Sequence, residues 1–120
     1  MTKQRESFGR ILRAKRMAVK LSLRKFAKMV GVSPTYLSQV EHENVMPPTA
    51  DRVKRMAELL GENPDEWIAL AGRVPEDVPD VIHKQPTEMP RLLREASELT
   101  TEQLRQVMEK IRRLKAENNQ

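Results

Sequence analysis

A short segment, residues 34–42, carries hydrogen-bonding side chains opposite the apolar pair Leu37 and Val40. The polar members are Thr35, Tyr36, Gln39 and His42. Hydroxyl, amide and imidazole groups at helical spacing donate and accept hydrogen bonds toward a second molecule. The chemistry that this pattern favours is recognition by hydrogen bonding.

Other kinds of chemistry find little support in the residue types. The two histidines, His42 and His83, are isolated, with no carboxylate at metal-ligand spacing on a shared helix face. The chain has no cysteine and its four glycines are dispersed, so thiolate sites and phosphate-binding glycine loops are not expected. No Ser/His/Asp set is apparent. We therefore predict a protein that is not an enzyme, with no catalytic residues, metal or cofactor.

Two short helices around a glycine are expected to position the polar segment. Apolar residues recur at helical spacing over residues 22–30, and Gly31 follows where a residue with positive φ is needed. Ser33 is suited to an N-cap and Pro34 to the first helical position of the next helix. A second helix that is narrow and polar on its outer face fits the DNA major groove. The segment is therefore interpreted as a DNA-binding helix-turn-helix.

Further helices are expected on either side of this pair. The complete set runs over about residues 7–16, 22–30, 34–42, 49–60 and 64–71, each with an apolar stripe. Pro47 and Pro48 mark a loop before the fourth helix. Five short helices closing at Gly72 predict an all-α domain over residues 1–72.

The rest of the chain is expected to be a linker and a helical tail. Residues 73–90 contain four prolines and are predicted to be a proline-rich linker, with a turn of helix at residues 80–84. Residues 91–120 are predicted to be a C-terminal helical dimerisation segment, with helices at about 91–98 and 101–118. Thr100 and Gln103 fit a capping box at the start of the last helix.

An apolar stripe along the last helix needs a surface to cover it. It consists of Leu104, Val107, Met108, Ile111 and Leu114. A homodimer in which these helices pack together is favoured, and folding of the helix back onto its own domain is the alternative.

The charge is unevenly distributed along the chain. Residues 1–60 hold 13 Lys and Arg against 5 Asp and Glu, a net of +8, whereas residues 61–120 hold 9 against 12, a net of −3. Basic charge around the helix-turn-helix favours a polyanionic partner. No signal peptide or membrane-spanning run is apparent. A cytoplasmic protein without a membrane partner, associated with the nucleoid when bound to DNA, is expected.

In this pattern the sequence resembles the Cro/CI-type (XRE) helix-turn-helix family, over about residues 7–71. The residues that carry the resemblance are Arg16, the run 23–33, the run 36–41, Leu59-Leu60-Gly61 and Asn-Pro-Asp-Glu-Trp at 63–67. The resemblance implies a five-helix, lambda-repressor-like DNA-binding domain, followed here by a linker and C-terminal helices.

The residues expected to contact DNA are assigned from their positions in the helix-turn-helix. The resemblance implies that base edges are contacted by Ser33, Thr35, Tyr36 and Gln39. By location, phosphates are expected to meet the helix start at Ser22, Leu23 and Arg24, and also His42 and Asn44. The resemblance further implies a structural salt bridge between Arg16 and Glu41, which joins the first helix to the end of the third.

The leading hypothesis is a sequence-specific transcriptional regulator, most often a repressor in this family, that binds an inverted-repeat operator in double-stranded DNA as a homodimer. The alternative is an antitoxin or protein-interaction module, which autoregulates its operon and binds a partner protein through the C-terminal helices. A third hypothesis, nonspecific nucleoid binding, predicts equal affinity for all duplexes at matched salt.

Overall fold

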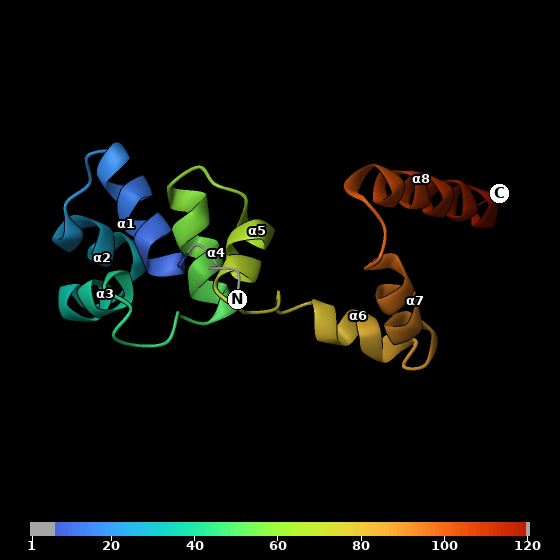
Figure 1. Cartoon of the computed structure of the whole chain (residues 1–120), viewed down its shortest axis with the longest axis horizontal. Helices are drawn as coiled ribbons and strands as arrows, with labels where there is room; N and C mark the ends of the chain where they lie inside the picture. Colours follow the sequence, from blue (N-terminus) through green and yellow to red (C-terminus); the bar gives the residue numbers. More distant parts are fainter. Residues whose placement is uncertain (1–6, 120) are drawn as a thin grey trace, which may run out of the picture. The chain divides into compact units, whose positions relative to one another are not determined.

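The computed structural model describes residues 7–119, and within this range the chain is entirely helical apart from turns and loops (Figure 1). The helices are α1 (Phe8–Ala18), α2 (Leu23–Val30), α3 (Pro34–Glu41), α4 (Ala50–Leu59), α5 (Pro64–Leu70), α6 (Val78–Lys84), α7 (Glu88–Ala96) and α8 (Thr101–Asn118). The all-α fold expected from the sequence is confirmed. Residues 1–6 of the predicted first domain, and Gln120, lie outside the described residues.

The chain divides after Val78 into two compact units. The first holds α1–α5 and the second holds most of α6, together with α7 and α8. The boundaries predicted at residues 72 and 90 remain a prediction, but hydrogen bonds within the first unit extend to Arg73.

Polar N-caps determine where four helices of the first unit begin. The side-chain oxygens of Ser7, Ser22, Ser33 and Asn63 accept hydrogen bonds from the backbone N–H groups of Arg10, Lys25, Tyr36 and Glu66, at 3.3, 3.0, 3.0 and 2.9 Å respectively. Each bond satisfies an N–H that has no partner inside its helix.

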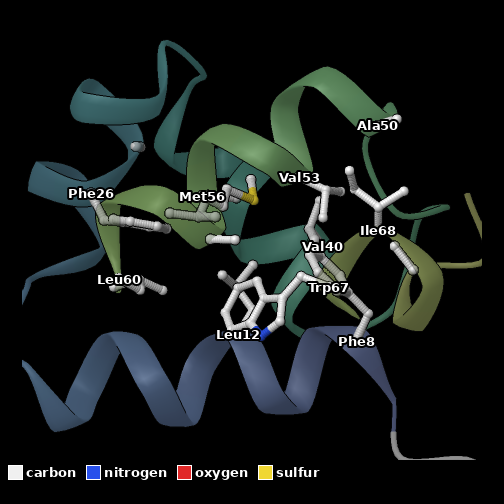
Figure 2. Close-up of a cluster of buried hydrophobic side chains, with 14 residues drawn as sticks. Phe8, Leu12, Phe26, Val40, Ala50, Val53, Met56, Leu60, Trp67 and Ile68 are labelled. Atoms are coloured by element: carbon white, nitrogen blue, oxygen red, sulfur yellow. The ribbon is translucent and has the colours of Figure 1, made fainter. Parts of the chain in front are cut away.

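The core of the first unit is formed by the inward faces of α1–α5 (Figure 2). Leu12, Phe26, Leu37, Val53 and Met56 are its largest fully buried side chains. Phe8 and Trp67 pack edge to face with ring centroids 5.8 Å apart, which joins the start of α1 to α5. The helix pairs in closest contact are α1 with α3, α2 with α3, α2 with α4, and α4 with α5. This packing holds α3 against two helices while its outer face stays uncovered.

Gly9 allows α1 to approach the end of α3 closely. A Cβ atom at this position would overlap the carbonyl oxygen of Val40 and lie 2.9 Å from that of Glu41. Both obstacles are backbone atoms, so a side chain at position 9 would have to push the helices apart. No local pattern in the sequence indicates this role for Gly9.

The second unit contains more helix than the sequence indicated. The region predicted as a linker with one helical turn contains all of α6, and α7 begins at Glu88, three residues before the predicted start. Pro79 and Pro90 both fall in the first turn of a helix, where the missing N–H would have no intrahelical acceptor. None of the described residues in α6, α7 or α8 is buried.

Replacing Gly9 by alanine tests the close approach. Glycine to alanine within an exposed helix normally stabilises a protein by about 0.5–1 kcal/mol. Here we expect G9A to lower the free energy of unfolding by about 1–3 kcal/mol, because the added methyl group overlaps backbone of α3. Urea unfolding followed by circular dichroism measures the change. A stabilised G9A variant would contradict the packing described.

Candidate nucleic-acid interface

A glycine turn sets the geometry between α2 and α3. Gly31 has φ of 89°, and both its N–H and that of Val32 donate to the carbonyl of Ala27 at 2.9 Å. These bonds close the end of α2, and the Ser33 cap then starts α3 two residues later. The helix-turn-helix is therefore present as the sequence predicted.

The outer face of α3 presents a row of polar side chains. Thr35, Ser38, Gln39 and His42 fall within an arc of about 100° around the helix axis, given 3.6 residues per turn. On the other side of the helix Leu37, Val40 and Glu41 are buried. Amide and hydroxyl groups in this arrangement match the donors and acceptors on base edges in a major groove.

Two of the predicted base contacts, Ser33 and Tyr36, also make contacts within the domain. The Ser33 hydroxyl is engaged as the N-cap of α3, accepting from the Tyr36 N–H. Tyr36 is half-buried and packs against the core. Thr35 is exposed and Gln39 is half-buried. The assignment of all four to base contacts remains a prediction.

The carboxyl end of α3 closes with a tight turn. Glu43 has φ of 63°; its N–H donates to the Val40 carbonyl at 3.1 Å, and the Asn44 N–H donates to the Gln39 carbonyl at 2.9 Å. His42 Nδ1 lies 2.8 Å from the Ser38 carbonyl oxygen, which requires a proton on that nitrogen. The ring then has Nε2 for a further partner. His42 and Asn44 are both exposed.

The amino end of α2 provides the other predicted phosphate contacts. The Ser22 hydroxyl caps the Lys25 N–H, and the N–H groups of Leu23 and Arg24 occupy the first turn, where no intrahelical acceptor exists. Lys25 is exposed, as is Arg24. Backbone donors and positive charge at a helix start suit a phosphate group, although this role too remains a prediction.

A buried ion pair joins α1 to α3. Arg16 Nε lies 2.7 Å from Glu41 Oε2, and Arg16 Nη2 lies 2.9 Å from Glu41 Oε1. Arg16 Nη1 also donates to the Leu21 carbonyl at 2.7 Å, in the turn before α2. The hydrogen bond to Glu41 raises the pKa of Arg16, outweighing the opposing effect of burial. The guanidinium is thus a charged connector among α1, α3 and the start of α2.

Two residues near this surface were not assigned to it from the sequence. Ser38 lies on the outer arc of α3, with its hydroxyl 3.4 Å from His42 Nδ1. Arg73, placed in the predicted linker, donates from its guanidinium to the carbonyls of Pro47 and Pro48 in the loop after α3. The helical periodicity of α3 could have indicated Ser38, whereas no local pattern indicates the partners of Arg73.

Within residues 7–119 neither a cluster of metal-ligating side chains nor a membrane-spanning helix is found. Over this range no three His, Asp or Glu side chains are grouped so that they could hold a metal ion. Every helix in the described part of the chain is too short or too polar to cross a membrane.

Comparisons with known proteins find several solved structures that are similar to part of this chain. Solved structures similar to this chain include the DNA-binding domain of the P22 C2 repressor, at 27% identity and a TM-score of 0.50, covering 55% of this chain and 86% of that one. They also include SinR, a master regulator for biofilm formation solved in complex with DNA (21%, TM-score 0.47, covering 51% and 97%), and the clp gene regulator ClgR from Corynebacterium glutamicum (23%, 0.48, covering 77% and 92%). No curated protein matches the chain in sequence.

The family model described as Helix-turn-helix matches residues 12–67, which span α1 to α5 except for the first residues of α1 and the last of α5. Residues 12–67 thus match the XRE-type helix-turn-helix family, and the resemblance noted in the sequence is confirmed for this part of the chain.

Replacing Arg16 by alanine tests how much the buried ion pair contributes to the free energy of unfolding. We expect R16A to lower the free energy of unfolding by about 3–5 kcal/mol, since it leaves the Glu41 carboxylate buried without its partner. Because the pKa of Arg16 is raised, the stabilisation does not fall with rising pH until strong alkali, and it is present wherever the Glu41 carboxylate is ionised. The loss should therefore be equal at mildly acidic and mildly alkaline pH.

The pair of Lys15 and Glu62, 3.7 Å apart with side chains 49% and 30% exposed, offers a control, because Lys15 lies on the same helix as Arg16. K15A should cost less than about 1 kcal/mol, because solvent screens that pair. Equal losses for R16A and K15A in urea unfolding would contradict the role given to Arg16.

Proposed function

We propose that this chain is a sequence-specific, non-enzymatic transcriptional regulator that represses by binding an inverted-repeat operator as a homodimer. The observation that carries the proposal is the outer face of α3, where polar side chains remain at least partly accessible while Leu37, Val40 and Glu41 on the opposite side are buried. The similarity to the P22 C2 repressor domain supports the same conclusion. The protein would act on DNA in the cytoplasm, associated with the nucleoid.

Each predicted contact has a distinct role in this proposal. Gln39 bonds adenine N6 and N7 in a bidentate manner, and Thr35 contacts a thymine methyl group or a nearby acceptor. Ser33 and Tyr36 lie at the start of α3, close to the sugar and base edges. The start of α2 at Ser22, Leu23 and Arg24 binds one phosphate, and His42 and Asn44 bind the other strand. Phosphate contacts fix the orientation, and base contacts determine the sequence.

A homodimer would set the form of the operator. Two recognition helices related by a twofold axis read half-sites about 34–36 Å apart, one helical turn of DNA. The stripe of Leu104, Val107, Met108, Ile111 and Leu114 on α8 is proposed as the dimer contact. Its last three members are exposed and its first two are half-buried. Occupation of a promoter by such a dimer would exclude polymerase.

Selection of bound duplexes from a random DNA pool at physiological salt tests the function. A palindromic consensus is expected from the wild-type chain. Q39A should bind a more degenerate set, because each good bidentate base contact contributes about 1–3 kcal/mol of discrimination. Its melting temperature should stay unchanged, since Gln39 makes no contribution to the core cluster.

Enrichment of one asymmetric half-site would contradict the homodimer, and no enrichment would reduce the interface to general affinity for nucleic acid. A large loss of thermal stability in Q39A would remove this residue from the reading face.

A protein-interaction module, such as an antitoxin that autoregulates its operon, is a second candidate. The observation that favours it is the absence of buried residues from the described parts of α6–α8, which leaves apolar surface for a partner. A different protein bound along α8 would then replace the second copy.

Light scattering separates these two candidates. We expect the wild-type chain to be a dimer and I111D to be a monomer with weaker operator binding, because a carboxylate in the apolar contact is desolvated without a partner. Q106D, which adds the same charge at an exposed position off the stripe, should remain dimeric. A monomeric wild-type chain would overturn the homodimer.

A further inference from the structure

The guanidinium of Arg73 binds the loop that follows α3. Its Nη2 donates to the Pro47 carbonyl at 2.6 Å and its Nε donates to the Pro48 carbonyl at 3.0 Å. Arg73 itself comes directly after Gly72, whose φ of 72° turns the chain at the end of α5. The Arg73 N–H donates to the Ile68 carbonyl at 2.9 Å, so its backbone is held as well as its side chain.

The loop has few other polar restraints. Pro47 and Pro48 have no N–H to donate. Within the described part of the chain, no backbone-to-backbone hydrogen bond involves residues 45–48. Met46 is 73% exposed and therefore adds little packing. The fork of Arg73, together with burial of Pro48, is consequently the main connection between this loop and the rest of the domain.

We infer that Arg73 is a positioning residue for DNA binding, which holds the loop so that Asn44 reaches a phosphate. The inference rests on the proposed function. Two parallel N–H groups on a planar guanidinium fix both the distance and the angle of the carbonyls that they bind. Asn44 stands at the start of the loop, immediately after the turn at Glu43, and only Val45 and Met46 separate it from Pro47 and Pro48, so freedom at the two prolines is transmitted to it.

The same geometry connects the loop to the segment that leads toward α6. Arg73 is half-buried and lies at the beginning of this segment, which runs through Pro75 to Val78. A displacement of the segment would therefore act on the loop beside the recognition helix.

Affinity measurements on the full chain test the role of Arg73. With the duplex selected by the wild-type protein, R73A should bind about tenfold more weakly, in line with loss of a charge-assisted hydrogen bond. R73K should remain nearly as weak, because lysine keeps the charge but cannot form the fork. The matched control R55A removes the same charge from an exposed position on α4 and should stay within about twofold of wild type at matched salt. Full affinity in R73K would overturn the inference in favour of a simple charge effect.

A double-mutant cycle asks whether Arg73 acts through Asn44. If it does, R73A and N44A lose the same part of the DNA-binding affinity. The double variant then binds DNA only slightly more weakly than whichever single variant binds it less tightly. Losses that multiply independently would overturn the inference.

Amide hydrogen exchange provides a readout without DNA. The N–H groups of Glu43 and Asn44, which donate to the carbonyls of Val40 and Gln39, should exchange faster in R73A and R73K than in wild type, while those of α1 and α4 keep their protection. Unchanged exchange of these N–H groups in either variant would overturn the inference. If R73A fails to fold, R73K alone provides the measurement. If the wild-type chain selects no duplex, the proposed function fails, and the positioning role for DNA binding fails with it. Exchange then still decides whether Arg73 holds the loop.

Discussion

The interaction on which the first unit depends is the binding of Arg16 to three elements at once. Its guanidinium donates to both carboxylate oxygens of Glu41 at the end of α3, and to the Leu21 carbonyl before α2. Only one-tenth of the Arg16 side chain and 2% of the Glu41 side chain are exposed, so each charge needs the other. Because α1 and α3 are fixed at this point, the outer face of α3 is presented on a rigid support.

Backbone conformation at the helix ends works together with this ion pair. Lys20 and Glu43 both have positive φ, 58° and 63°, although neither is glycine. Each such residue costs about 1–2 kcal/mol relative to ordinary backbone, and each closes a helix through two backbone hydrogen bonds. One strained turn lies just before α2 and the other just after α3. The proposed phosphate contacts therefore follow from two turns whose strain is offset by the packing between them.

Local signals in the sequence were sufficient for much of this arrangement. The caps Ser22 and Ser33, the turn at Gly31 and the capping box at Thr100 all occur as predicted, because each depends on residues within four positions. The linker prediction was wrong at Pro79 and Pro90. A proline usually indicates the end of a helix, but both of these lie in the first turn of a helix, where proline is tolerated. The close approach at Gly9 and the bonds from Arg73 join residues at least 25 positions apart, so local periodicity carries no trace of them.

The second unit places a different physical demand on the protein. Helices of 7, 9 and 18 residues without buried side chains gain little from propensity alone, because helix nucleation is costly. The exposed ion pairs of α8, such as Arg112 with Glu109, add only about 0.3–0.5 kcal/mol each. Burial of the apolar stripe on α8 is then the main way in which these helices could gain stability, and this burial requires another surface. If a second copy provides that surface, assembly of the tail and order in its helices rise together with concentration, and paired recognition helices become available only where the protein is abundant.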